Sequence, residues 1–192
     1  MAGITQTVAP AETPISLAEA KAHLRVDTSD EDALITTLIE AATVMAQTYT
    51  RRQFVSATYA QTFDAFPASG VIELGRHPLV SVSSITYTDT DGNTGQTWSS
   101  ANYTVVSDPV VGYVVPAYDE EFPATREVPN AVTVTYVAGY GAASAVPDAI
   151  KAAIKLIVGD LFEHREARTE ARLEDNPAVQ HLLDTVRVMG VH

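Results

Sequence analysis

The sequence predicts an α+β fold in which a helical bundle, built from N- and C-terminal helices, carries an inserted antiparallel β region. Apolar residues recur every three or four positions over 31–49 and again over 147–162, which is the period of an amphipathic helix. The segment 54–138 between them instead alternates with a period of two and is interrupted by Gly and Pro. Hydrophobic residues make up 46% of the 192 positions, enough to bury a sizeable core.

This pattern divides the chain into three parts. Residues 1–15 are small and polar with interspersed prolines, and we expect them to form a flexible N-terminal arm. Residues 16–53 and 139–192 are expected to pack together as one discontinuous helical domain, because the apolar faces of their helices need partners. Residues 54–138 form the β-rich insertion.

The first helices have recognisable ends. Ser16 followed by Glu19 is a capping box and predicts the start of a short helix. The long helix over 31–49 ends near Arg51 and Arg52, whose cations suit the unpaired carbonyls of a helix C-terminus. Its apolar side consists of Leu34, Ile35, Leu38, Ile39, Ala42 and Met45.

Strands follow from Phe54 onward. The sequence Asp91-Gly92-Asn93 predicts a hairpin turn, since these residues tolerate the backbone angles of tight turns. The further strands are expected over 71–74, 80–88, 97–106, 112–115 and 131–138.

Two helices are expected after the β region. Pro147 suits the first position of a helix and Asp148 its first turn. After a highly charged segment over 163–175, Asn176-Pro177 begins a last helix. Its apolar stripe comprises Val179, Leu182, Leu183 and Val186.

Composition excludes several classes of protein. The formal net charge is −12, from 24 acidic side chains against 12 Lys and Arg, so the average surface repels phosphate and a protein that wraps nucleic acid is not expected. The absence of cysteine excludes disulfides, thiolate zinc sites and cysteine nucleophiles. Residues 1–15 lack the pattern of a secretory signal, and no apolar run is long enough to span a bilayer. We therefore expect synthesis in the cytoplasm and no membrane partner.

Candidate chemical motifs all have structural interpretations. The glycines of 139–144 follow a strand, yet Ser144 replaces the third glycine of a dinucleotide-binding loop and no βαβ unit surrounds it. Asp89, Asp91 and Asn93 lack the glycine and final carboxylate of a calcium loop. His164 lies in a charged run typical of a solvated helix end. We predict no catalytic, cofactor or metal site, with an acid–base site dispersed over distant residues as the enzymatic alternative.

Several stretches, in this order and spacing from about residue 14 to 166, resemble the head–tail connector (adaptor) family of tailed bacteriophages, which also occurs in prophages and gene transfer agents. They begin with Pro14-Ile15-Ser16-Leu17-Ala18-Glu19-Ala20 and Asp30-Glu31-Asp32-Ala33-Leu34-Ile35. Further matches are Tyr49-Thr50-Arg51-Arg52, Ile85-Thr86-Tyr87, Val134-Thr135-Tyr136-Val137-Ala138-Gly139-Tyr140-Gly141 and Val146-Pro147-Asp148-Ala149-Ile150-Lys151.

The resemblance implies a structural virion protein at the head–tail junction, made in the bacterial host cytoplasm. It implies a homo-oligomeric ring, usually of twelve subunits, beneath the portal protein and above a tail or stopper protein, through which DNA passes without specific binding. Because a small domain does not fully cover the apolar stripe of the last helix, we expect this helix to contact the portal or a neighbouring subunit. The residues predicted for this interface are Leu182, Leu183, Val186, Arg187 and Met189.

Besides the enzymatic alternative, a binding module remains as an alternative to a connector. The β region is also compatible with a β-sandwich-like binding module for carbohydrate or a host surface, carried on a helical scaffold. Its binding site would be an aromatic platform formed by Trp98, Tyr103, Tyr113 and Tyr118, although a place in the core is the commoner explanation of such residues.

Overall fold

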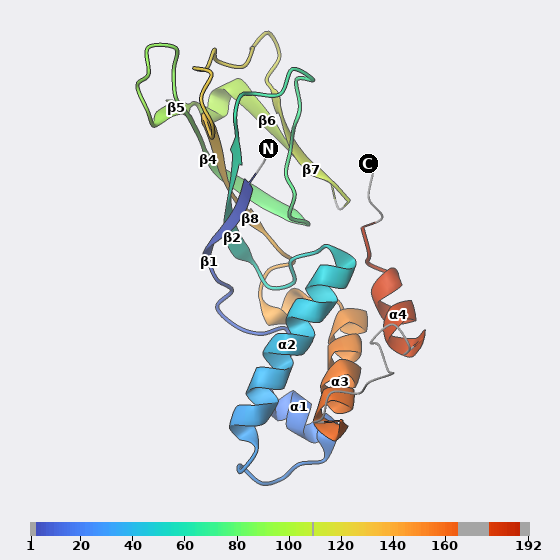
Figure 1. Cartoon of the computed structure of the whole chain (residues 1–192). Helices are drawn as coiled ribbons and strands as arrows, with labels where there is room; N and C mark the ends of the chain where they lie inside the picture. Colours follow the sequence, from blue (N-terminus) through green and yellow to red (C-terminus); the bar gives the residue numbers. More distant parts are fainter. Residues whose placement is uncertain (1–2, 109, 165–176, 189–192) are drawn as a thin grey trace. The chain divides into compact units, whose positions relative to one another are not determined.

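A computed structural model describes residues 3–108, 110–164 and 177–188 of the chain. Their contacts divide the protein into two compact units, one comprising Met1–Ala11 with Ser56–Tyr140 and the other Glu12–Val55 with Gly141–His192. Helices from the N- and C-terminal parts pack together, and antiparallel sheets lie between them in the sequence (Figure 1). The predicted α+β class is confirmed.

The helical unit contains the α-helices of the described residues. Helix α3 packs against α1, α2 and α4, which joins the two ends of the chain around one core. The helices are α1 (Leu17–Leu24), α2 (Asp32–Thr50), α3 (Asp148–Glu163) and α4 (Pro177–Asp184), with a short 3-10 helix, η2 (Ala143–Ala145), before α3.

The α2–α3 pair forms the centre of this core. Ile35 and Ile39 of α2 and Ile154 and Ile157 of α3 are at most 2% exposed. Fully burying a side chain of this size stabilises the fold by about 1.5–3 kcal/mol. The spacing of three or four residues that predicted both helices thus corresponds to the faces that are buried.

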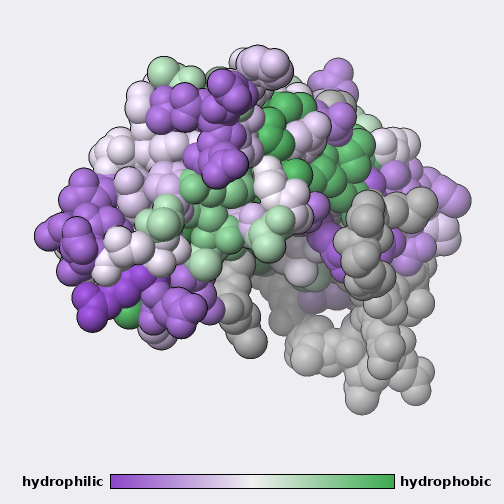
Figure 2. Space-filling view, turned by 90° about the horizontal axis from the view of Figure 1, so that it is seen from above, coloured by the Kyte–Doolittle hydropathy of each residue, from purple (hydrophilic) through white to green (hydrophobic). Residues whose placement is uncertain are grey.

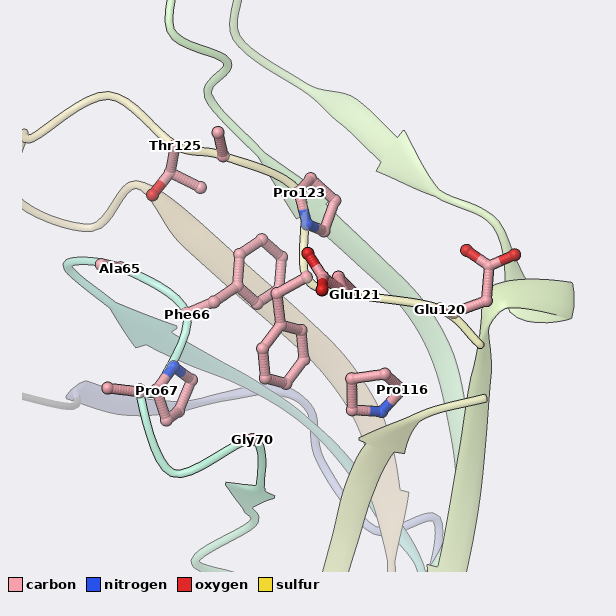
Figure 3. Close-up of a pocket in the computed structure, with 12 residues that line it drawn as sticks. Ala65, Phe66, Pro67, Gly70, Pro116, Glu120, Glu121, Pro123 and Thr125 are labelled. Carbon is pink, nitrogen blue, oxygen red and sulfur yellow. The ribbon is translucent and has the colours of Figure 1, made fainter. Parts of the chain in front are cut away.

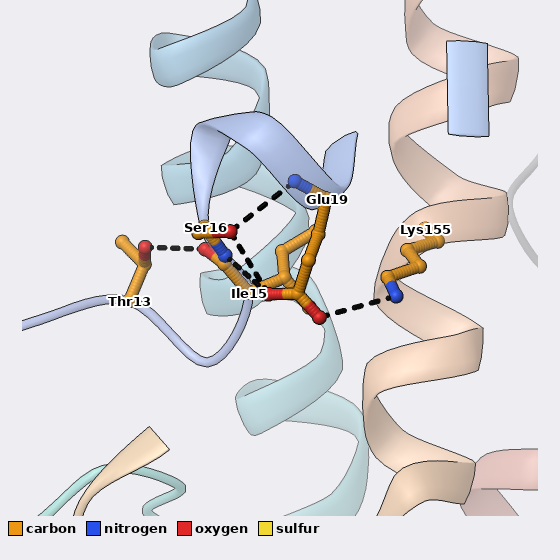
Figure 4. Close-up of polar contacts among 5 residues, drawn as sticks. All are labelled: Thr13, Ile15, Ser16, Glu19 and Lys155. Atoms are coloured by element: carbon orange, nitrogen blue, oxygen red, sulfur yellow. Dashed lines mark hydrogen bonds and ion pairs between the residues drawn. The ribbon is translucent and has the colours of Figure 1, made fainter. Parts of the chain in front are cut away.

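Helix α1 begins with the predicted capping box (Figure 4). The Ser16 backbone N–H donates to Glu19 Oε2 at 2.8 Å, and the Glu19 backbone N–H donates to Ser16 Oγ at 3.2 Å. Lys155 Nζ of α3 donates to Glu19 Oε1 at 3.3 Å. The hydrogen bond from the Ser16 backbone is the main cause that lowers the pKa of the Glu19 carboxyl. The cap therefore starts α1 and also ties it to α3.

The β unit consists of two antiparallel sheets. The five-stranded sheet has the order β1-β2-β8-β4-β5 and the three-stranded sheet the order β3-β7-β6. The strands are β1 (Gly3–Val8), β2 (Ala57–Phe63), β3 (Ile72–Glu73), β4 (Leu79–Tyr87), β5 (Gln96–Trp98), β6 (Tyr103–Ser107), β7 (Gly112–Pro116) and β8 (Val132–Ala138). Both sheets contribute to one hydrophobic core, in which Tyr136, Ile85, Ile72 and Val114 are fully buried.

Two parts of this unit differ from the sequence-based expectation. Residues 3–8, expected within a flexible arm, form strand β1, which pairs antiparallel with β2. All six residues of β1 are exposed, so the strand is attached mainly through its backbone and leaves no hydrophobic pattern in the sequence. The single strand expected over 97–106 was wrong, because a 3-10 turn, η1 (Ser100–Asn102), separates β5 from β6 and places them in different sheets.

Candidate interaction surfaces

Helix α4 is anchored to the helical unit by two apolar side chains one turn apart. Val179 is 3% exposed and Leu183 is 2% exposed, and α4 contacts both α2 and α3. Beyond the helix, Val188 is also buried. A helix of eight residues is too short to be stable alone in water, so these buried side chains hold it in place.

Polar contacts join the end of α4 to the end of α2. The Tyr49 hydroxyl donates to Asp184 Oδ1 at 2.8 Å, and the Arg187 guanidinium lies 4.5 Å from the centre of the Tyr49 ring. Arg187 Nη1 also lies 3.8 Å from Asp184 Oδ1. The hydrogen bond to the Asp184 carboxylate is the main reason that the pKa of Tyr49 is raised, because it favours the protonated phenol.

Residues just after α2 fix the chain that follows α4. Arg51 ends α2 in the left-handed conformation with φ of 57°. Arg52 is buried, and its Nε donates to the backbone carbonyl of Val186. The Val188 N–H donates to the carbonyl of Thr50 at 3.1 Å. Both arginines were predicted at the end of α2, but this contact was not, because Arg52 and Val186 are 134 positions apart and leave no local pattern.

The residues predicted to contact a partner have different environments. Leu183 is buried, Leu182 and Val186 are half-buried, and Arg187 is exposed. Met189 lies outside the described residues. Leu183 therefore acts inside its own subunit, whereas Leu182, Val186 and Arg187 reach the surface.

The β unit carries an open groove of about 440 Å³ (Figure 3). The rings of Phe66 and Phe122 stack within it, with centroids 4.8 Å apart and planes at 11°. Prolines 67, 116 and 123 add to its apolar wall, and the exposed Glu120 and Glu121 lie among its lining residues. Figure 2, which views the molecule from above, shows hydrophobic residues reaching the surface between hydrophilic ones.

The aromatic platform of the alternative function is not formed. Trp98 is 4% exposed and Tyr103 is 9% exposed, and their rings pack against each other at 5.1 Å in the core of the β unit. Tyr113 is half-buried, while Tyr118 is fully exposed. Four aromatic residues of which two are buried cannot present one flat binding face, and Trp98 and Tyr103 instead have the core position that is the commoner explanation of such residues.

Residues considered for chemistry serve the fold. Asp89 accepts hydrogen bonds from the backbone and side chain of Asn93, both at 2.9 Å, and these chiefly lower the pKa of its carboxyl. His164 Nδ1 lies 3.2 Å from Asp160 Oδ1 at the end of α3. In the part of the chain that the structure describes, no three His, Asp or Glu side chains are grouped to hold a metal ion. None of the helices within the described ranges has both the length and the apolar character needed to cross a bilayer.

Comparison with known proteins identifies the family. A family model described as "Phage gp6-like head-tail connector protein" matches residues 14–109. The chain belongs to this family. The connector family is structural and not enzymatic, and its members lie at the head–tail junction of the virion, so the resemblance inferred from the sequence is confirmed.

Solved structures show where the connector's fold recurs. A chain from the neck of an empty gene transfer agent (GTA) particle, computed with C6 symmetry, has a TM-score of 0.83 at 20% identity and covers 99% of this chain and 97% of its own. A chain from the neck of a native GTA particle, computed with C12 symmetry, has a TM-score of 0.80 at 19% identity, covering 99% and 97%. A chain from the virion of a native GTA particle has a TM-score of 0.80 at 21% identity, covering 98% and 97%. No curated protein matches the connector.

Proposed function

We propose that this connector forms a closed ring of twelve subunits beneath the portal protein and continues the DNA channel toward a tail or stopper protein. The match to the connector family over residues 14–109 carries this proposal. The likeness of fold to chains in GTA necks computed with C6 and C12 symmetry supports it. Such a ring uses a heterologous interface, in which two different surfaces of each subunit meet and the rotation between neighbours closes.

The charge of the chain is compatible with a DNA passage. A protein that neutralises many phosphates with Lys and Arg binds DNA tightly, whereas this chain has a formal net charge of −12. A ring of such subunits lets DNA move through without holding it. We expect no sequence-specific binding to DNA.

We further propose that the surface of the last helix and the residues after it contact the portal or a neighbouring subunit. Leu182 and Val186 are only half-buried and Arg187 is exposed, so all three can touch a partner while Leu183 anchors the helix. Removing the chain after Pro177 should abolish attachment to the portal. A truncated protein that still attaches to the portal would refute the role of this segment. The closed ring is tested by a separate experiment.

Electron microscopy of the purified connector with and without the portal protein of the same virus tests the ring. We expect a closed ring with twelve-fold symmetry on one end of the portal. Density that is absent, or attached as single subunits without closure, would overturn the proposal.

A further inference from the structure

Both edges of the five-stranded sheet are open strands without charged residues. Strand β1 lies at one edge and β5 at the other, and within the described ranges no strand pairs with the outer side of either. The edge segments 3–8 and 93–98 contain no Asp, Glu, Lys or Arg and no Pro. Natural sheets usually protect exposed edges with charges, prolines, bulges or very short strands, because an open row of N–H and C=O groups pairs readily with another strand. Here β1 has a register shift between Gln6 and Val8 and β5 is only three residues long, but neither edge carries a charge or a proline.

Strand β1 buries none of its residues in its own subunit. All six of its residues are exposed, including Ile4 at 39% and Val8 at 59%. Residues 93–97 at the opposite edge are exposed as well. These segments are therefore available to a neighbour, and they offer backbone hydrogen bonds rather than buried side chains.

The absence of charged residues at these edges suits contact with a second copy of this chain. Two copies that each carry a formal net charge of −12 repel each other over most of their surface. Segments 3–8 and 93–98 are places where the backbones of two copies can meet without bringing like charges together. Because one edge is β1 and the other is β5, the contact joins two different surfaces, which is the head-to-tail geometry that a ring requires.

We propose that β1 of one subunit pairs with β5 of the next, so that the five-stranded sheets join edge to edge around the assembly. This inference rests on the proposed ring and names the contact between its subunits. A pair that includes the three-residue β5 is short and weak by itself, so many such contacts must close together for the ring to persist.

Engineered disulfides test the pairing directly, because the natural chain has no cysteine. Within one subunit three strands separate β1 from β5, which places them roughly 19 Å apart at the usual spacing between strands. A disulfide needs Cβ atoms about 3.5–4.5 Å apart, so a bond between these strands can only form between subunits.

Four double variants combine Thr5→Cys or Gln6→Cys with Gln96→Cys or Thr97→Cys, which places a cysteine on each face of both strands. Each is assembled with the portal protein, oxidised and run on a non-reducing gel, while electron microscopy of the same sample records whether rings are present. We expect at least one double variant to give a ladder of multimers. The matched control, Thr36→Cys with Thr97→Cys, should remain monomeric on the gel.

The outcomes separate this inference from the ring itself. Rings without a ladder in any double variant would overturn the β1–β5 contact and leave the ring standing. A disulfide dimer from Thr5→Cys alone would show β1 pairing with β1 and would also overturn it. Absence of rings on the portal for both the variants and the natural protein would refute the proposed function, and this inference with it.

A charge variant provides a second measurement. Thr5→Asp places a carboxylate on the edge of β1, where the side chain is exposed and its replacement leaves the core intact. We expect it to lower the fraction of portals that carry a complete ring, whereas Thr36→Asp on the exposed side of α2 should not. Equal ring occupancy for the two variants would count against the edge contact.

Discussion

Replacement of Leu183 by Ala should release α4 while the rest of the helical unit stays folded. Leu183 is 2% exposed, and truncating a buried leucine to alanine costs about 2–5 kcal/mol. Within the described residues 177–188, Val179 and Val188 then remain as the buried apolar contacts. An eight-residue helix has little stability of its own, so a loss of this size is comparable to the free energy that holds α4 in place.

Hydrogen–deuterium exchange measures this release residue by residue. A loss of about 2 kcal/mol raises the exchange rate of protected amides about 30-fold, and we expect this increase over residues 178–188 while the centre of α3 changes little. Leu182→Ala is the matched control, because the neighbouring leucine is only half-buried and its truncation should cost less. Unchanged protection of 178–188 in Leu183→Ala, or an equal loss throughout α2 and α3, would refute the docking of α4 through this side chain.

Three further changes test other contacts. The pKa of the Glu19 carboxyl is lowered from its ordinary 4.5, chiefly by the hydrogen bond from the Ser16 backbone, so its stabilising effect is present above about pH 4.5 and is lost as pH falls through the lowered pKa. Glu19→Gln should therefore lose less urea resistance on acidification than the natural protein does. An identical loss in the two proteins would contradict this. The pKa of Tyr49 is raised above its ordinary 10.0, so its hydrogen bond to Asp184 stabilises α4 below about pH 10 and is lost as pH rises through the raised pKa. In Asp184→Asn, a spectrophotometric titration should show that the pKa of Tyr49 is no longer raised by this hydrogen bond. A Tyr49 pKa that stays equally raised would exclude the carboxylate as the cause. Gly159→Ala in the interior of α3 should stabilise the protein by up to about 1 kcal/mol, because the added Cβ meets His23 Nε2 at an ordinary 3.6 Å, and a lower melting temperature would contradict this.

The sequence predicted those elements whose own residues record their environment. The apolar period of α2 and α3, the capping box at Ser16 and the hairpin turn at 91–93 are local signals, and each has the expected structure. Pairing of β4 with β5 beyond this turn follows from the same signal.

Features that depend on distant residues were not predictable in this way. Strand β1 buries no side chain, so its pairing with β2 has no counterpart in the hydrophobic pattern. The break between β5 and β6 depends on the Ser99 side chain, which accepts a hydrogen bond from the Ala101 N–H and favours a 3-10 turn inside an otherwise strand-like run. The apolar stripe of α4 predicted that all of its residues face a partner. The contacts of α4 with α2 and α3 show instead that Leu183 faces the core of its own subunit.

Native mass spectrometry of the connector bound to its portal tests the central claim most directly. A closed ring predicts one dominant complex, heavier than the portal alone by twelve chains of 20.5 kDa each. A portal whose mass is unchanged, or a series of complexes with no preferred number of added chains, would contradict a connector that works by ring closure.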